Sequence, residues 1–211
     1  MFSPQTYYRL FELHNAAIWP AQIVAMVAGL ALAAIALRRP HLQRSALIIL
    51  AAIWLWTGWS YLFIRYASIN WAAPWLAAAF ALQAALLLLS AFAGSRSTHR
   101  DSVARPVGLG LLLFALAIQP LLDIAHGRDW TGMQLFGIAP DPTVVATFGF
   151  LLAVGRIHWL LLAIPLGWCA VSAATLWTMA SPDVWVMLLA ALITLLAAGH
   201  AALRRSGGPQ R

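Results

Sequence analysis

Three polar side chains follow one another along an apolar segment near residue 120, and their types suit proton or metal chemistry. Gln119, Asp123 and His126 have the spacing i, i+4 and i+7, which places them on one face of a helix. An acid beside a histidine can relay a proton or supply two ligands to a metal ion, and the sequence does not indicate which metal. The alternative interpretation is an acid at a helix end that simply reaches water.

A second polar face lies on the first long apolar segment. Asn15, Trp19 and Gln22 share this face by helical spacing, and small residues such as Gly29 continue it. Two interpretations stay open. The amides form hydrogen bonds between helices while Gly29 allows close packing, or the face lines a ligand site.

The segment 136–143 combines an acid with prolines before a short apolar run. Asp141 precedes Pro142, so the pattern predicts an extended N-cap residue followed by proline at the first helical position. Alternatively, the short helix points its N-terminus into a solvent-filled pocket lined by Thr143 and Thr147, as interrupted helices do in transporters.

One basic residue is a candidate partner for the acids of these polar segments. Arg65 shares a helical face with Trp54 and Tyr61, and we expect it to pair with Asp123 or Asp141, or to bind an anionic ligand. The alternative is an arginine at the membrane boundary. The two aromatic rings, together with a tryptophan of the first apolar segment, could wall a site for an apolar or cationic ligand.

Several chemistries are missing from the sequence. There is no lysine, which excludes Schiff-base cofactors, and the single Cys169 cannot form an internal disulfide. The six histidines all lie near the ends of apolar segments, and no phosphate-binding loop, zinc-protease motif or nucleophile elbow occurs. The sequence therefore predicts no cofactor and no catalytic residue, and it favours a role other than catalysis.

The composition decides the class of protein that must hold these residues. Of 211 residues, 63% are hydrophobic and only 9% are charged, too few to cover a water-soluble surface. A membrane-spanning helix needs roughly 20 apolar residues. Seven such helices fit the chain, whereas twelve would need about 240 residues. A full-length twelve-helix transporter is thereby excluded.

The apolar segments predict an all-α fold, a polytopic integral membrane protein with a bundle of seven transmembrane helices. Residues 1–205 form one domain, in which 1–14 is an interfacial helix, and 206–211 form a flexible cytoplasmic tail. The predicted spans are 16–37, 45–64, 71–93, 106–124, 142–155, 159–180 and 183–203.

Arginine placement predicts the orientation, because basic residues accumulate in cytoplasmic loops. With the N-terminus outside and the C-terminus cytoplasmic, ten arginines fall inside and three outside; if 142–155 does not span, the split becomes six to seven. The formal net charge of +7 is therefore interpreted as a topology signal in a bacterial inner membrane, and no nucleic-acid partner is predicted. The three external arginines are Arg9, Arg65 and Arg128.

Four stretches together resemble a bacterial integral-membrane family classed as a domain of unknown function, whose members are sometimes labelled "MFS transporter permease". The resemblance covers nearly the whole chain and implies a membrane protein, but it carries no assigned functional residues. The stretches are YYRLFELHNAAIWPAQ (7–22), RYASINWAA (65–73), FGIAPDPTVVATFGFLL (136–152) and IPLGWCAVSAATLW (164–177).

Polar residues from four segments fall at one depth in the external half, which favours a protein that binds or transports a small solute or ion. The first alternative is an accessory or scaffold subunit that contacts lipid and other membrane subunits. The second is an enzyme acting on a lipid or quinone, which lacks a second deep acid or base. The predicted ligand-binding residues are Asn15, Trp19, Gln22, Arg65, Gln119, Asp123, Asp141 and Thr143.

Overall fold

The computed structural model describes residues 4–93 and 102–206, and within these ranges the chain forms helices without strands. The all-α prediction is thereby confirmed. The predicted tail, 206–211, lies outside the described residues except for the last residue of α9. The helices are α1 (Pro4–Ala17), α2 (Ala21–Arg38), α3 (Gln43–Thr57), α4 (Ala73–Phe92), α5 (Ala104–Leu113), α6 (Gln119–Ala125), α7 (Pro140–Ala153), α8 (Trp159–Thr178) and α9 (Val184–Ser206).

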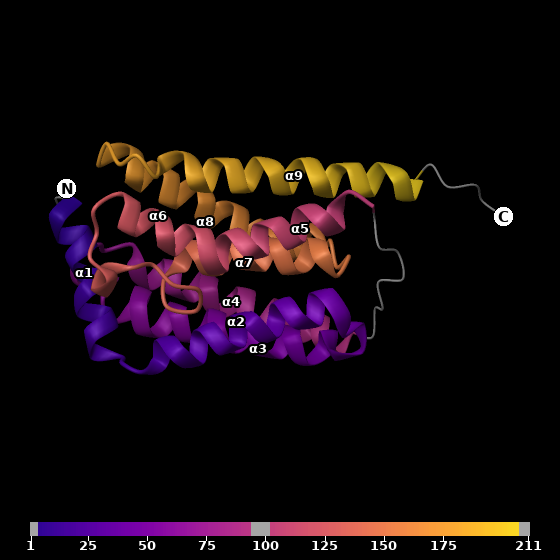
Figure 1. Cartoon of the computed structure of the whole chain (residues 1–211), viewed down its shortest axis with the longest axis horizontal. Helices are drawn as coiled ribbons and strands as arrows, with labels where there is room; N and C mark the ends of the chain where they lie inside the picture. The colour runs from indigo at the N-terminus through magenta and orange to yellow at the C-terminus, as the bar shows by residue number, and fades with distance from the viewer. Residues whose placement is uncertain (1–3, 94–101, 207–211) are drawn as a thin grey trace.

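Six helical stretches are long and apolar enough to cross a membrane, and they run roughly along the long axis of the molecule (Figure 1). Two of them are composite, because π-helical turns extend α3 at Gly58–Phe63 and join α5 to α6 at Phe114–Ile118. They coincide with six of the seven predicted spans. The stretches are Ala21–Arg38, Gln43–Ser68, Ala73–Phe92, Ala104–Ala125, Trp159–Thr178 and Val184–Arg204.

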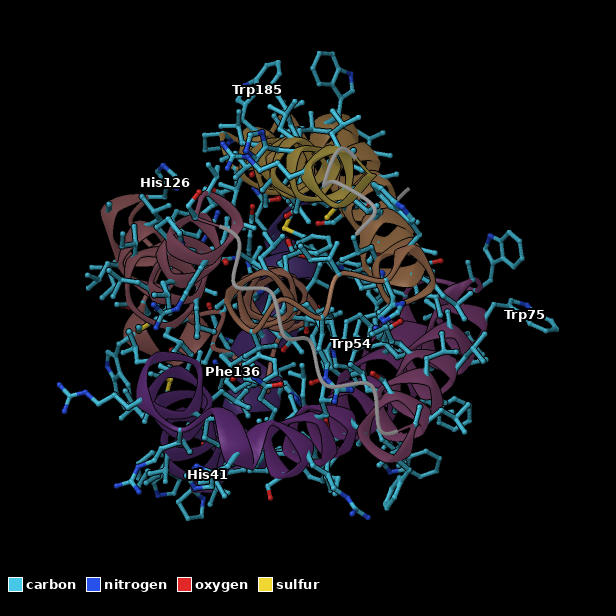
Figure 2. All side chains as sticks on the ribbon, turned by 90° about the vertical axis from the view of Figure 1, so that its right-hand side faces the viewer. His41, Trp54, Trp75, His126, Phe136 and Trp185 are labelled. Atoms are coloured by element: carbon cyan, nitrogen blue, oxygen red, sulfur yellow. The ribbon has the colours of Figure 1, made fainter. Side chains whose placement is uncertain are left out.

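The remaining predicted span, 142–155, corresponds to α7, whose 14 residues are all buried. Seen from the end of the bundle, α7 lies in the middle with the other helices around it (Figure 2). A helix of 14 residues is about 21 Å long, well short of the roughly 30 Å of a bilayer core. Because neighbouring helices enclose α7, its length does not have to match the bilayer.

The closest packing in the bundle joins α5 to α7 through two glycines. A Cβ atom on Gly108 would lie 2.4 Å from the backbone nitrogen of Ala153, and one on Gly149 would lie 2.6 Å from that of Leu112. Small residues allow two helix backbones to approach this closely. Such packing favours helix association inside a membrane, where the hydrophobic effect does not drive it.

Helix α1 lies across one end of the bundle, on the left in Figure 1. Its buried face carries Tyr7, Leu10, Phe11 and His14, and the ring of Phe11 stacks on Tyr61 with centroids 4.7 Å apart. This end, called the α1 end below, also holds the loop 126–139 and the start of α7, and it contains most of the polar side chains discussed next.

Candidate functional site

Three carboxylates from three different helix ends line one small cavity at the α1 end. Asp123 comes from the last turn of α6, Asp141 from the first turn of α7, and Asp183 from the residue before α9. The cavity measures about 20 Å³, enough for one water molecule. We call it the acidic cavity; its wall is completed by Gln119, Leu122, Gln134, Leu176 and Val186.

Arg128 pairs with two of the carboxylates that line the acidic cavity. Its guanidinium forms ion pairs with both Asp123 and Asp183, and it also donates to the hydroxyl of Tyr8 at 3.0 Å. Burial alone would lower the pKa of Arg128, but Asp183, Tyr8 and Asp123 outweigh that effect and raise it. The arginine therefore stays charged and pairs with two of the three carboxylates.

Each of these two carboxylates has a further partner. The second oxygen of Asp123 accepts a hydrogen bond of 2.6 Å from the backbone N–H of Gln134, which holds the loop against α6. Nδ1 of His126 lies 2.8 Å from Oδ1 of Asp183. His126 therefore pairs with Asp183 and not with Asp123, the partner that the helical spacing indicated.

Asp141 differs from the other two acids because its partners are neutral. Oδ1 accepts a hydrogen bond of 2.7 Å from the indole N–H of Trp168, and Oδ2 accepts one of 2.8 Å from the hydroxyl of Ser172. The residue is 5% exposed and forms no ion pair within the described part of the chain. A buried carboxylate without a cation is costly, although the N-terminus of α7 offsets part of that cost.

The cap of α7 is not the predicted one. Ala139 occupies the N-cap position with extended backbone angles, and Asp141 turns its carboxylate to α8. The hydroxyl of Thr143 serves the loop instead, since it accepts from the N–H of Gly137 at 2.9 Å and donates to the carbonyl of Ala139 at 2.7 Å.

Two side-chain amide oxygens at the acidic cavity have no hydrogen-bond partner among the described residues. They belong to Gln119 and Gln134, each 7% exposed and each part of the cavity wall. Both atoms can only accept hydrogen bonds or coordinate a cation. The cavity therefore presents an excess of acceptors over donors, which suits a bound proton donor or a small cation.

A larger open hollow lies on the other side of Arg128, between α1 and the loop 127–132. It has a volume of about 520 Å³, and Tyr8 and Arg128 form part of its wall. The ring of Tyr8 packs against the guanidinium of Arg128 at 4.1 Å. Because Arg128 also pairs with Asp123 and Asp183, it connects the wall of the hollow to the wall of the acidic cavity.

The structure brings together only some of the predicted site residues. Gln119, Asp123 and Asp141 share the acidic cavity. Arg65 forms no ion pair with Asp123 or Asp141, so the predicted pairing is wrong. Asp123 pairs with Arg128 instead, an arginine that was predicted to lie on the external side but was not among the predicted site residues.

Asn15, Trp19 and Gln22 lie in a separate, mostly apolar groove of about 520 Å³. The amide of Asn15 donates to the carbonyls of Thr131 and Met133, and the amide of Gln22 donates to the carbonyl of Asn15. Their hydrogen bonds fix the loop against α1 and the start of α2, which supports the packing interpretation of this face.

Sequence reasoning missed five polar residues of the site: Arg128, Gln134, Trp168, Ser172 and Asp183. Two of them left a signal, because Trp168 and Ser172 are spaced i, i+4 on an otherwise apolar helix and so share a face. Arg128 and Gln134 lie in a loop, where periodicity says nothing about position. Within the described residues, no group of three or more histidines, cysteines and acids could hold a metal ion.

Comparison with known proteins yields a family but no function. A family model for DUF6064, a family of unknown function, matches residues 4–206. No curated protein and no solved structure matches the chain significantly.

Proposed function

The chain belongs to DUF6064, a family of unknown function, and from its site we propose that it binds a small ion in the acidic cavity and transports it across a membrane. The six apolar helical stretches that are long enough to cross a membrane support this proposal. The accessory-subunit and enzyme alternatives have no comparable observation in their favour.

One observation carries the proposal: Asp141 is a buried carboxylate without a cationic partner, at a cavity where the amide oxygens of Gln119 and Gln134 have no hydrogen-bond partner among the described residues. An ionisable residue at membrane depth is expensive unless it has a role, and such residues mark ion pathways in many membrane proteins. A bound positive charge would neutralise Asp141 and satisfy the oxygens of Gln119 and Gln134.

The proposed architecture has seven helices in the bilayer, with α7 as the enclosed fifth span. The arginine distribution supports an N-terminus outside and a C-terminus in the cytoplasm of a bacterial cell. The acidic cavity then faces the outside. A reporter that is active only outside the cytoplasm is expected to be inactive when fused to the C-terminus, and activity there would contradict this orientation.

Transport requires a second conformation, because the route inward from the cavity is closed. Beyond Thr147, which accepts a hydrogen bond of 2.8 Å from Trp54, the remaining residues of α7 are apolar and buried. A continuous polar pore is therefore absent from the described bundle. We propose that the ion enters past Arg128 and leaves after the helices around α7 rearrange.

The test is ion flux into liposomes that contain the purified protein and carry an imposed membrane potential. Radioactive sodium and an internal pH dye follow the two simplest cations in parallel. We expect uptake of one of them, and its loss in Asp141→Asn, which keeps the size of the side chain but removes the charge.

Asp129→Asn is the matched control, because Asp129 is an exposed acid in the loop at the same end of the molecule. This variant is expected to transport like the parent protein. Absence of any flux from folded parent protein, or equal flux in Asp141→Asn, would contradict the proposed function.

A further inference from the structure

We propose that the ion is a proton and that Asp141 is the group that binds it; this inference rests on the proposed function and names its substrate. Asp141 lies between two cavities of water-molecule size, and the Ser172 hydroxyl that contacts its carboxylate belongs to the wall of the second one.

The ion pairs of the acidic cavity single out one of its three carboxylates. Arg128 forms ion pairs with both Asp123 and Asp183, and His126 contacts Asp183 as well. Of these three carboxylates, only Asp141 has no cationic partner among the described side chains. One proton bound to Asp141 neutralises its carboxylate at no cost in volume.

The size and ligands of the cavity disfavour a metal ion. A volume of about 20 Å³ holds one water molecule. Hard cations need about six oxygen ligands in a shell around them. Here two of the three carboxylates already point their oxygens at Arg128, and the part of the chain that the structure describes contains no metal-binding cluster. A proton needs only an acceptor and one donor water.

The second cavity gives the proton a place to go. It measures about 10 Å³, lies against Ser172, and is walled mainly by aromatic rings, Tyr61 and Trp168 among them. The hydroxyl of Tyr61 is buried and has no hydrogen-bond partner within the described residues. A hydroxyl can donate and accept at once, so Ser172 can pass a proton between Asp141 and a water molecule there.

The transfer balances in two steps. A hydrated proton in the acidic cavity binds the carboxylate of Asp141, forming one O–H bond and leaving a neutral water molecule. The carboxylic acid then gives its proton to the oxygen of Ser172 while Ser172 releases its own hydroxyl proton to water in the second cavity. Asp141 returns to the carboxylate, and no electron moves.

The titratable groups around Asp141 agree with this role. Asp123 and Asp183 face it across the acidic cavity, and both are held by Arg128. On the other side the titratable groups are three phenols and a thiol, none of which can carry a positive charge: Tyr7, Tyr61, Tyr66 and Cys169.

Infrared spectroscopy of the protein in lipid tests the proton directly. During acid titration we expect the carbonyl stretch of a protonated carboxylic acid to appear, to shift in heavy water, and to disappear in Asp141→Asn. The band is expected to persist in Asp129→Asn. A titration in which Asp141→Asn and the parent protein give the same spectra would overturn the proposal.

Flux through the liposomes separates this inference from the proposed function. Acidification of the lumen without sodium entry, lost in Asp141→Asn, supports both. Sodium entry that depends on Asp141 without acidification keeps the proposed function and refutes the proton. No flux of either ion from folded protein refutes both.

Ser172 variants test the relay. Ser172→Ala is expected to slow proton flux about fivefold or more, the size of one lost hydrogen bond, and Ser172→Thr is expected to restore it. Ser68→Ala, which removes an exposed hydroxyl at the same end, is the control. Equal flux in Ser172→Ala and the parent would remove Ser172 from the path.

Discussion

The indole nitrogen of Trp168 lies 2.7 Å from Oδ1 of Asp141, so a side chain in the middle of α8 holds the carboxylate at the start of α7. The same indole packs edge-to-face on Phe80 of α4, with ring centroids 5.1 Å apart. One tryptophan thus links the central helix to two of its neighbours, and its ring and its N–H can be tested separately.

Trp168→Phe keeps the ring and removes the donor. We expect the free energy of unfolding in detergent to fall by about 1.5–3 kcal/mol, because a buried charged acceptor loses a hydrogen bond. Trp177→Phe, an exposed position on the same helix, should leave it unchanged. In an Asp141→Asn background the effect of Trp168→Phe should shrink; an equal effect there would show that the hydrogen bond contributes nothing.

Arg128 is the cation that the acidic cavity depends on. Arg128→Met removes the arginine that pairs with the buried Asp123 and Asp183, and we expect a loss of about 3–5 kcal/mol in unfolding free energy. Arg65→Met is the matched control, since Arg65 pairs with neither acid, and it should stay within about 0.5 kcal/mol of the parent.

A further variant distinguishes charge from geometry at this position. Arg128→Lys keeps the charge but replaces a planar fork by a single ammonium group, so it should recover only part of the lost stability. If Arg65→Met lowered the unfolding free energy as much as Arg128→Met, the ion pairs assigned to Arg128 would be wrong.

The apolar segments could be predicted from the sequence because bilayer thickness sets the length of a spanning helix. That rule located six helices but could not place α7, since a helix that is apolar on every side gives the same pattern whether it faces lipid or other helices. Its length of 14 residues, too short for a spanning helix, was the visible clue to an enclosed position.

The candidate site was predictable only where helical spacing applies. Gln119 and Asp123 were found together because they are four positions apart on one helix. Arg128 and Gln134 were not, because the loop 126–139 folds back through hydrogen bonds that no periodic pattern encodes. The same reason explains why Arg65 was assigned a pairing that Arg128 makes.

The contact between α5 and α7 allows a sharp test of packing. Gly149→Ala places a methyl group 2.6 Å from the backbone nitrogen of Leu112, which cannot move without shifting α5. We expect a loss of about 1–3 kcal/mol or more in unfolding free energy, as for overpacking of a core. Gly110→Ala on α5 meets no atom within 4 Å and should be neutral or slightly stabilising. Equal melting temperatures for the two variants would argue against this helix contact.

His14 predicts how stability depends on pH. It is fully buried, neither ring nitrogen has a hydrogen-bond partner among the described residues, and its ring lies 5.4 Å from that of Tyr61. Burial, helped by the charge of Arg65, lowers the pKa of His14 from 6.5 to about 4. The folded protein therefore keeps the imidazole neutral at a pH where the unfolded chain protonates it.

The direction in which stability changes with pH follows from which state, folded or unfolded, binds the proton. Above about pH 6.5 both states hold a neutral imidazole and His14 adds no pH dependence. As the pH falls from 6.5 towards 4, only the unfolded state gains the proton, so the folded protein loses stability, by roughly 3 kcal/mol at pH 4.

His14→Phe and His14→Leu should flatten this part of the curve and raise stability at neutral pH, because each removes two unpaired buried nitrogens. The measurement is unfolding free energy against pH in detergent. The difference between parent and variant isolates His14 from the acids, which titrate in both. His158→Gln, an exposed histidine in the connection before α8, should retain the slope of the parent. Parallel curves for the parent and both His14 variants would show that His14 is not held neutral by burial.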